Sequence, residues 1–351
     1  MQGTIEKVLE AIAKAVKDDS FINKHKSREE DFTRNRHLSF EDITNFVIGN
    51  LGTSMDFEVL NFCKGRIDVS VAAVCKARDK IKYTAFEEIF KLSAGCIPVV
   101  QTNKGYRLTA FDGMKGELPR TKELVLACKT PIKQGYPEFH AIAEYDILNC
   151  CYTNAIFNLG TIDERKAAEK LLEKHEYSGA EIFLLDRGFP SIKLLSALEQ
   201  SGKNYVMRVS KSFLTEVNGF YESNRTDELI EVKYNKWRGR NSRVKGIEYP
   251  CLLCFRCVKI ELSSGETEIL VTNLDKDKFP RKEIGELYGL RWKIETSFLN
   301  LKYAVCIEDF MGKKENGIKQ EFFASLIKSN LYMQFVGAAN DIIYNKKNNK
   351  T

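Results

Sequence analysis

Long apolar runs are missing from this 351-residue chain: none reaches the roughly 18 residues that a membrane-spanning helix needs. The first ten residues, M-Q-G-T-I-E-K-V-L-E, contain acidic side chains and no apolar core of a secretion signal. We therefore expect a cytoplasmic protein with no membrane partner. Because 43% of the residues are hydrophobic, the chain can bury a sizeable core, in two or three domains or in one large domain with an insertion.

Histidine is scarce as well. The four histidines, His25, His37, His140 and His175, are not paired at metal-ligand spacing, and the sequence has no nucleophile-elbow motif. Metal chemistry based on histidine and Ser–His–Asp hydrolysis are therefore disfavoured.

The ten cysteines are scattered through apolar surroundings. In a chain without an export signal we expect reduced thiols that serve as small core residues. The run C-L-L-C-F-R-C at 251–257 offers three sulfurs, but no fourth Cys or His is nearby and the segment is strand-like. A zinc site there is the less favoured alternative.

Basic residues exceed acidic ones only slightly, by 54 to 48, which gives a net charge of +6. This charge is compatible with binding to nucleic acid, but it is also common among cytosolic proteins. Charge alone therefore does not establish a partner.

Residues 1–100 are predicted to form short helices. Ser39 stands where an N-cap is expected, and Thr84-x-x-Glu87 has the pattern of a capping box. The polar run after the first helix predicts a loosely held arm over residues 1–35. The apolar spacing predicts helices at Thr4–Val16, Phe40–Gly49, Met55–Cys63, Ser70–Lys82 and Ala85–Leu92.

The helix expected at 70–82 gathers four basic residues on the side away from its apolar positions: Lys76, Arg78, Lys80 and Lys82. A basic helix among short helices is a candidate for a DNA-contacting unit of the helix-turn-helix kind. An ordinary helical bundle with a lysine-rich exposed face explains the pattern equally well.

The pattern changes to strands from residue 105. The first three strands are expected to form an antiparallel meander, and the later strand–helix–strand units are expected to be parallel crossovers. Residues 114–137 are expected to be a polar excursion. The predicted strands are Tyr106–Phe111, Phe139–Ile147, Cys150–Asn158, Glu181–Leu185 and Asn204–Val209, and the predicted helices are Glu164–His175 and Ser191–Gln200.

Two of these strands end in an aspartate that is followed by glycine within two residues, as Asp112-Gly113 and Asp186-Arg187-Gly188. In α/β sheets, active sites are built at the carboxyl ends of the strands. For either aspartate taken alone, a turn or cap residue is the simpler interpretation.

Residues 211–275 interrupt this alternation with strand-like segments at Leu229–Asn235, Ser242–Val244, Ile247–Ile260 and Glu268–Thr272. A basic stretch there surrounds Trp237: Lys233, Lys236, Arg238, Arg240 and Arg243. Such a mixture suits contact with phosphates and an unstacked base. An exposed twisted hairpin with a half-buried Trp is an equal alternative.

The stretch from Glu286 to Lys302 has apolar residues at helical spacing and predicts one continuous amphipathic helix. On another face of this helix, four polar residues fall in one line: Tyr288, Arg291, Glu295 and Lys302. Taken alone, the line is most simply a solvated charged face with an i,i+4 pair. A turn-rich linker at 307–317 and an apolar helix at Phe322–Ala339 are expected to follow.

The spacing Tyr288-x2-Arg291-x3-Glu295-x6-Lys302 resembles the Tyr–Arg–Glu–Lys signature of DDE transposases, in the bacterial family named after insertion sequence four. The two strand-end aspartates and the β-rich segment before the signature match that family too. The resemblance runs from about residue 34 to about residue 332. The chain departs from it in the lysine-rich segment 113–137 and in its fairly short C-terminal region.

The resemblance implies an α/β fold: an RNase H-like mixed sheet flanked by helices, with a β-rich insertion and an N-terminal helical domain. It divides the chain into a helical DNA-binding region (1–100), a first part of the catalytic core (101–210), the β-rich insertion (211–277), a second part of the core (278–345) and a tail (346–351).

It also implies a catalytic set of three carboxylates, Asp112, Asp186 and Glu295, that would hold two Mg²⁺ ions, for which Mn²⁺ could substitute. Cleaving a phosphodiester with water and rejoining it to a 3′-hydroxyl needs two such ions and no covalent protein intermediate. Mg²⁺ prefers oxygen ligands, and we expect Asp112 to be shared between the ions.

In the same resemblance, Tyr288, Arg291 and Lys302 would grip phosphates near the scissile bond, and Trp237 is the candidate for stacking on an extruded base. Four further residues are candidate DNA contacts: Arg187, Arg238, Lys76 and Arg78.

The implied function is a cut-and-paste transposase that binds terminal inverted repeats of double-stranded DNA and joins them to target DNA. Such an enzyme is expected to act as a homodimer in a synaptic complex, near the bacterial nucleoid. Two alternatives remain open at this point: an inactive or domesticated relative that binds DNA without cutting it, and a structure-selective nuclease of the same fold.

Overall fold

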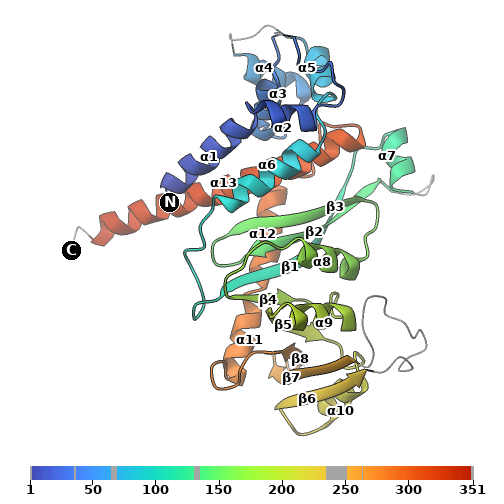
Figure 1. The fold of residues 1–351 in the computed structure, drawn as a ribbon, viewed down its shortest axis with the longest axis vertical. Coiled ribbons are helices and arrows are strands. Elements are labelled where there is room, and N and C mark those ends of the chain that lie inside the picture. Colours follow the sequence, from blue (N-terminus) through green and yellow to red (C-terminus); the bar gives the residue numbers. More distant parts are fainter. Residues whose placement is uncertain are drawn as a thin grey trace.

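The protein is described here by a computed structural model that covers residues 2–34, 37–64, 69–129, 135–234, 251–262 and 264–348. One eight-stranded sheet runs through it, in the order β3-β2-β1-β4-β5-β8-β7-β6, with helices on both faces (Figure 1). None of the helices in these residues is long and apolar enough to cross a membrane.

The first five strands form the centre of the fold. β1, β2 and β3 pair as the predicted antiparallel meander, whereas β1, β4 and β5 are parallel neighbours, which confirms the predicted crossovers. These strands are β1 (Arg107–Glu117), β2 (Glu138–Asp146), β3 (Cys151–Leu159), β4 (Glu181–Leu185) and β5 (Asn204–Val209).

The β-rich segment extends the same sheet. It contains β6 (Asp227–Tyr234), β7 (Cys251–Glu261) and β8 (Thr267–Thr272), and β8 pairs antiparallel with β5. The predicted strand at 242–244 and the residues Trp237 and Arg238 lie outside the described residues.

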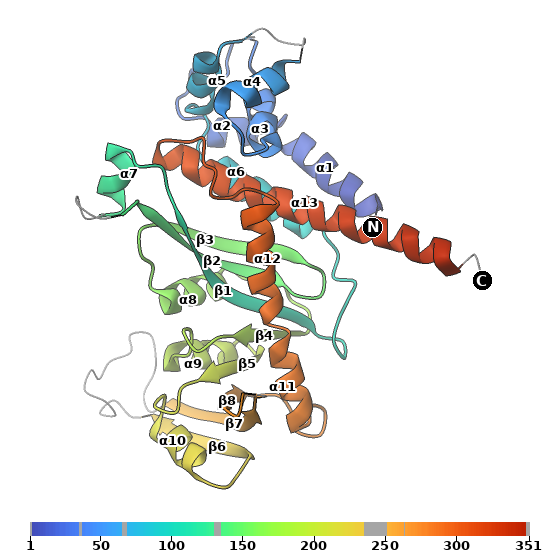
Figure 2. The ribbon, with the colours of Figure 1, turned by 180° about the vertical axis from the view of Figure 1, so that it is seen from behind.

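Each face of the sheet is covered by its own helices. One face packs on α8 (Glu164–Glu173), α9 (Ile192–Gln200) and α10 (Thr215–Glu222), and its core includes Phe111. The opposite core includes Ala110. Because side chains alternate along a strand, Asp112 shares the face of Ala110. Figure 2 shows α12 (Trp292–Tyr303) crossing this second face.

The helix predicted over residues 286–302 is broken in two, which corrects the expectation of one continuous helix. α11 (Arg281–Gly289) ends at Leu290, and α12 begins after Arg291. At the junction, i→i−3 bonds replace the helical ladder: Arg291 N donates to Tyr288 O (3.0 Å) and Ile294 N to Arg291 O (3.0 Å). Gly289, a weak helix former, immediately precedes the break.

The N-terminal region is helical as predicted, but the loosely held arm predicted at 1–35 is wrong for its described residues, 2–34. Val8 and Val16 are 1% exposed, and Phe21 is also buried. Figure 1 shows α1 beside α6 and α13. A few apolar residues at helical spacing lie among the polar ones, and their burial is enough to hold this segment against the rest of the protein. The helices are α1 (Gln2–Ala15), α2 (Asp19–His25), α3 (Phe40–Gly49), α4 (Met55–Cys63), α5 (Val71–Arg78) and α6 (Thr84–Gly95).

The two predicted caps differ in outcome. Ser39 does cap α3, because its Oγ accepts from Asp42 N at 3.0 Å. The capping box at Thr84 is wrong: α6 has no side-chain cap, and the Thr84 hydroxyl lies 2.9 Å from His25 Nδ1 instead. A long-range partner has displaced the local one.

Two further segments are more regular than predicted. In the expected polar excursion at 114–137, β1 continues to Glu117 and is followed by α7 (Lys122–Ala127). The last helix, α13 (Glu315–Asn348), is longer than expected at both ends and buries Phe322 and Phe323.

Candidate active site

The two aspartates are brought side by side by the parallel register of β1 and β4. Asp186 follows the end of β4 as predicted, but the strand end predicted at Asp112 is wrong, because β1 continues to Glu117 and Asp112 lies within it, where the pairing with β4 stops. Phe111 is paired with Leu185, and each is followed directly by an aspartate, Asp112 and Asp186. Across the face of the sheet, the start of α12 supplies Glu295. The three acids, 183 residues apart in sequence at most, therefore gather at one edge of the sheet.

Arg291 lies between two of these acids. Its Nη1 donates to Asp112 Oδ2 at 3.1 Å, and its Nη2 donates to Glu295 Oε1 at 2.7 Å. Arg291 is 3% exposed and so is not on a solvated face, whereas the side chains of its partners Asp112 and Glu295 are 19% and 38% exposed. Among the described residues its Nε has no hydrogen-bond partner.

Tyr288 contacts the third acid. Its hydroxyl donates to Asp186 Oδ1 at 3.2 Å, and the residue is 5% exposed. Burial, with the negative charge of Asp186, raises the pKa of the phenol. Tyr288 therefore stays protonated at neutral pH and donates a hydrogen bond, and Arg291 and Tyr288 together contact all three acids.

The electrostatics of this group are unbalanced. Burial, chiefly, raises the pKa of Asp112 to about 6, and the charges of Glu295 and Asp186 add to the effect. The Gly113 N–H and Arg291 act in the opposite direction. When the three carboxylates are ionised they face one guanidinium, so the site carries excess negative charge that a cation would relieve.

The donor set suits a hard divalent cation, since Asp112, Asp186 and Glu295 offer only carboxylate oxygens. Their arrangement in this structure, however, does not form a metal site. Within the described ranges, no group of three His, Cys, Asp or Glu side chains is arranged to hold a metal ion. The Arg291 guanidinium stands between Asp112 and Glu295, so the residues fit the cation in chemistry but must release Arg291 to hold it.

Sequence reasoning missed Glu164, at the start of α8. A Cβ on Gly188 would lie 2.8 Å from Glu164 Oε2, and a Cβ on Gly113 would lie 3.2 Å from Oε1. His140 Nε2 lies 3.3 Å from the same carboxylate. The glycines that follow the two aspartates could have indicated it. Gly113 and Gly188 have no side chain and so leave room for the Glu164 carboxylate beside both strands.

The other predicted site residues are dispersed. Lys302, near the end of α12, is half-exposed and pairs with Glu308 at 3.0 Å. Arg187 and Lys76 are exposed, as DNA contacts would require.

Arg78 requires a correction, because it is 4% exposed and does not lie on the basic face of α5. Its Nε donates to Gln320 Oε1 at 2.7 Å and its Nη2 to the Gly317 carbonyl at 2.6 Å, while Nη1 pairs with Glu321. Arg78 therefore anchors α5 to α13. The position of Arg78 among the basic residues of this helix did not reveal its long-range partners.

Comparison with known proteins decides the family. Residues 103–331 match the model of the transposase DDE domain. The chain belongs to the transposase DDE domain family. The matched range contains Asp112, Asp186, Arg291 and Glu295.

One similar protein supports this membership, and a second shows the fold. The DDE-family chain is 23% identical over 277 residues to transposase InsG for insertion sequence element IS4 of Escherichia coli K12, which confirms the predicted family resemblance. The match covers 75% of this chain and 60% of that relative's length. A piggyBac transposase, solved as a synaptic complex with hairpin DNA, superposes with a TM-score of 0.50 at 12% identity, covering 95% and 76% of the two chains. This second likeness shows the fold and confirms the predicted class.

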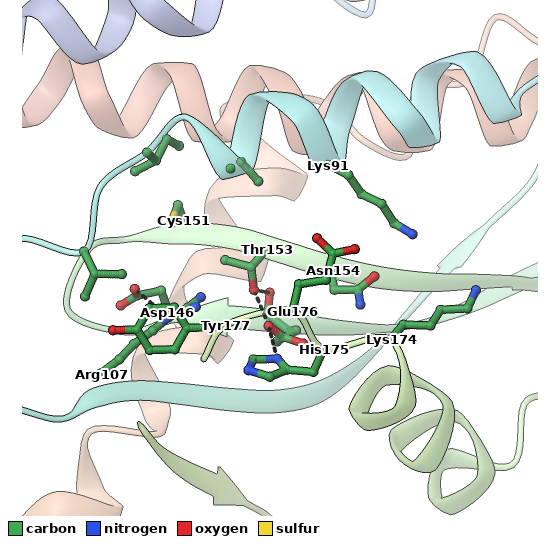
Figure 3. Close-up of a pocket in the computed structure, with 15 residues that line it drawn as sticks. Lys91, Arg107, Asp146, Cys151, Thr153, Asn154, Lys174, His175, Glu176 and Tyr177 are labelled. Carbon is green, nitrogen blue, oxygen red and sulfur yellow. Dashed lines mark hydrogen bonds and ion pairs between the residues drawn. The ribbon is translucent and has the colours of Figure 1, made fainter. Parts of the chain in front are cut away.

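The DDE-family chain has a second buried ionic cluster, at the amino ends of β1 and β4. Arg107 Nε lies 2.9 Å from Asp146 Oδ2 and 3.6 Å from Glu181 Oε1. His175 lies between Glu144, at 3.1 Å, and Glu181, at 2.6 Å. Figure 3 shows Arg107, Asp146 and His175 around a cavity of about 400 Å³.

His175 is held in its charged form. Burial by itself lowers the pKa of the imidazole, but hydrogen bonds to Glu144 and Glu181 outweigh it and raise the pKa to about 9. This second cluster therefore supplies its own positive charges.

Proposed function

We propose that this protein is a DNA transposase whose catalytic residues are Asp112, Asp186 and Glu295. The observation that carries the proposal is the meeting of these acids at one sheet edge, with excess negative charge, in a chain of the DDE family. A purely structural ion pair would not need three carboxylates for one guanidinium.

Each side chain has a distinct part in the proposed reaction. Two divalent cations, Mg²⁺ or Mn²⁺, would supply activation of the attacking oxygen and stabilisation of the leaving oxygen when bound. Asp112, on the central strand, would be the ligand shared between them, with Asp186 and Glu295 completing the set. Arg291 would grip a phosphate with two parallel donors, and Lys302 would act as a point charge. Tyr288, kept protonated, would donate to a terminal phosphate.

The DNA partner is proposed to be the terminal inverted repeats of a transposable element, followed by target DNA. Exposed Lys76 and Arg187 are the described residues outside the signature that remain candidate contacts. A homodimer in the synaptic complex and the division of the chain into a DNA-binding region, a core in two parts and an insertion belong to the same proposal.

The proposal is tested with Asp112→Asn, Asp186→Asn and Glu295→Gln on DNA carrying the element's ends. Each variant is expected to lose Mg²⁺-dependent cleavage while it still binds the ends. Glu286→Gln is the matched control, because Glu286 is an exposed carboxylate on α11 whose side chain is 63% exposed. Mg²⁺-dependent nicking by the Asp112→Asn protein would contradict the assignment.

The same assay separates the two alternatives. An inactive relative would bind ends without any cleavage by the wild type. A structure-selective nuclease would cut branched DNA but yield no strand-transfer products, whereas a transposase joins the cut end to target DNA.

A further inference from the structure

Every candidate metal ligand is already bonded to a residue of the Tyr–Arg–Glu–Lys line. Arg291 bridges Asp112 and Glu295 at 3.1 and 2.7 Å, and the Tyr288 hydroxyl is 3.2 Å from Asp186. These are the residues that the proposed function assigns to DNA phosphates. In this arrangement they face the acids instead.

The bridge excludes a cation from the pair of acids that it joins. A guanidinium and a divalent ion cannot both lie between the same two carboxylates, because the two like charges would repel and the oxygens would be shared. Arg291 is buried and bonded to both acids at once, so the guanidinium is held in place even though the Glu295 side chain is partly exposed. Arg291 therefore serves as an internal counter-ion in the DNA-free protein.

The buried guanidinium is not fully satisfied in this position. Among the described residues, its Nε lacks a hydrogen-bond acceptor while it is buried. An unsatisfied buried donor costs about 1–3 kcal/mol. A phosphate, whose oxygens accept from two guanidinium nitrogens at once, would remove that penalty.

The backbone offers a place for movement. The break between α11 and α12 lies at Leu290 and Arg291 themselves, where i→i−3 bonds replace the helical ladder. Short stretches of this kind often mark hinges in helices. Arg291 can therefore change partners without disrupting either helix interior.

We propose that Arg291 is a latch that blocks divalent-cation binding between Asp112 and Glu295 until a DNA phosphate draws the guanidinium away. The latch rests on the proposed function, because it needs both a cation and a DNA phosphate as competing partners. The latch couples DNA binding to metal binding. A DNA phosphate opens the metal site, and the DNA-free protein holds no divalent cation between Asp112 and Glu295. Tyr288 makes the corresponding contact at Asp186.

The test measures Mn²⁺ binding to the full-length protein without DNA, by isothermal titration calorimetry. Arg291→Met, which keeps bulk but removes the charge and donors, is expected to bind Mn²⁺ at least about tenfold more tightly than wild type. Arg291→Lys, which offers one point charge in place of a fork, is expected to fall between them. The extra affinity of Arg291→Met should disappear when Asp112→Asn is added.

The control is Arg187→Gln, which removes the same charge beside Asp186 from an exposed position. It is expected to change Mn²⁺ affinity by less than about threefold, so a general electrostatic effect is separated from release of the bridge. If Arg291→Met does not fold, as judged by circular dichroism, the Arg291→Lys measurement decides. Unchanged or weaker Mn²⁺ binding by a folded Arg291 variant would overturn the latch.

The outcome is distinguishable from failure of the proposed function. If wild type cleaves and joins DNA while the Arg291 variants bind Mn²⁺ no better than wild type, the latch is wrong and the transposase assignment stands. If the variants bind Mn²⁺ more tightly but no cleavage occurs, the bridge controls a metal site whose chemistry is different.

Discussion

Two ionic clusters lie at opposite ends of the parallel pairing between β1 and β4, which runs from Arg107 beside Glu181 to Phe111 beside Leu185. At the amino ends, Arg107, His175 and Lys203 face an equal number of acids, Glu144, Asp146 and Glu181. At the carboxyl end of this pairing, Arg291 is the one cation among the described residues that forms ion pairs with the three acids; it bonds Asp112 and Glu295, while Asp186 accepts from Tyr288. The acids of the first cluster are buried, whereas those of the second are partly exposed, and only the first cluster is balanced in charge.

The difference separates a structural cluster from a candidate catalytic one. Buried charges that are fully paired hold elements in place, and losing one partner is strongly destabilising. Acids that outnumber the nearby positive charges destabilise the fold until a cation binds, and such sites are typical of functional centres. The predictions below compare the response of the two ends to loss of a charge.

The largest expected effect is at the balanced end. Arg107→Met should lower the free energy of unfolding by about 3–5 kcal/mol, because Asp146 and Glu181 would be left buried without their partner. Chemical denaturation at pH 7 measures it. The control is Lys104→Met, a change of an exposed cation that pairs with Glu283, which should cost less than about 1 kcal/mol. Equal effects from the two variants would show that the amino-end cluster is not structural.

The second prediction concerns pH. His175 has a folded-state pKa of about 9, above its value in the unfolded chain, so protonation favours the folded state. The stabilisation is fully present below about pH 6.5 and is lost as pH rises through 9, by at most about 3 kcal/mol. Denaturation midpoints between pH 6 and 10 should show the loss, and His175→Gln should flatten it. Exposed His37→Gln serves as control, and persistence of the slope in His175→Gln would refute the assignment.

The third prediction is that removing a charge from the carboxyl-end cluster raises stability, whereas removing one from the amino-end cluster lowers it. Asp112→Asn should stabilise the metal-free protein by about 1–2 kcal/mol at pH 7, because burial and two neighbouring carboxylates raise the pKa of Asp112 and disfavour its ionised form. Thermal denaturation in the presence of a chelator checks it. Asp79→Asn, at a surface pair with Lys314, should change stability by no more than about 0.5 kcal/mol. A destabilised Asp112→Asn would mean that the carboxyl-end cluster is already balanced.

The smallest effect is expected beside the candidate site. Gly188→Ala should cost about 1 kcal/mol, because its Cβ would lie 2.8 Å from Glu164 Oε2 and the carboxylate, at the end of a flexible side chain, must shift. In a Glu164→Ala background the same substitution should cost almost nothing. Gly219→Ala in α10, with no atom near the added Cβ, is the control and should not destabilise. A cost that persists without Glu164 would point to the backbone.

The candidate site was predictable where the information is local. Apolar runs that stop at an acid single out Asp112 and Asp186, although only Asp186 follows the end of its strand. The spacing of the later polar residues singles out Tyr288, Arg291 and Glu295, although the helix expected to carry them is broken at Leu290. The parallel register of β1 and β4 then brings the aspartates together. These features survive because they depend on short segments with strong patterns.

What the sequence did not reveal depends on long-range partners. Arg78 looked like an exposed base until α13 supplied Gln320 and Glu321. Thr84 looked like a cap until α2 placed His25 beside it. The Arg291–Glu295 pair was foreseen, but not the bridge to Asp112, which exists only because α12 lies across the sheet. Spacing along one element cannot show what another element brings.

The central claim is that a divalent cation binds at the carboxyl-end cluster and not at the amino-end one. The most direct measurement uses the protein bound to the element's DNA ends, the state in which the Arg291 bridge is proposed to be open. It supplies Fe²⁺ in place of Mg²⁺, generates hydroxyl radicals with ascorbate and peroxide, and maps where the polypeptide is cut. The account predicts cuts near residues 112, 186 and 295, and none near 107, 146 or 181. Cuts confined to the amino-end positions, or none near the three acids under saturating iron, would contradict it.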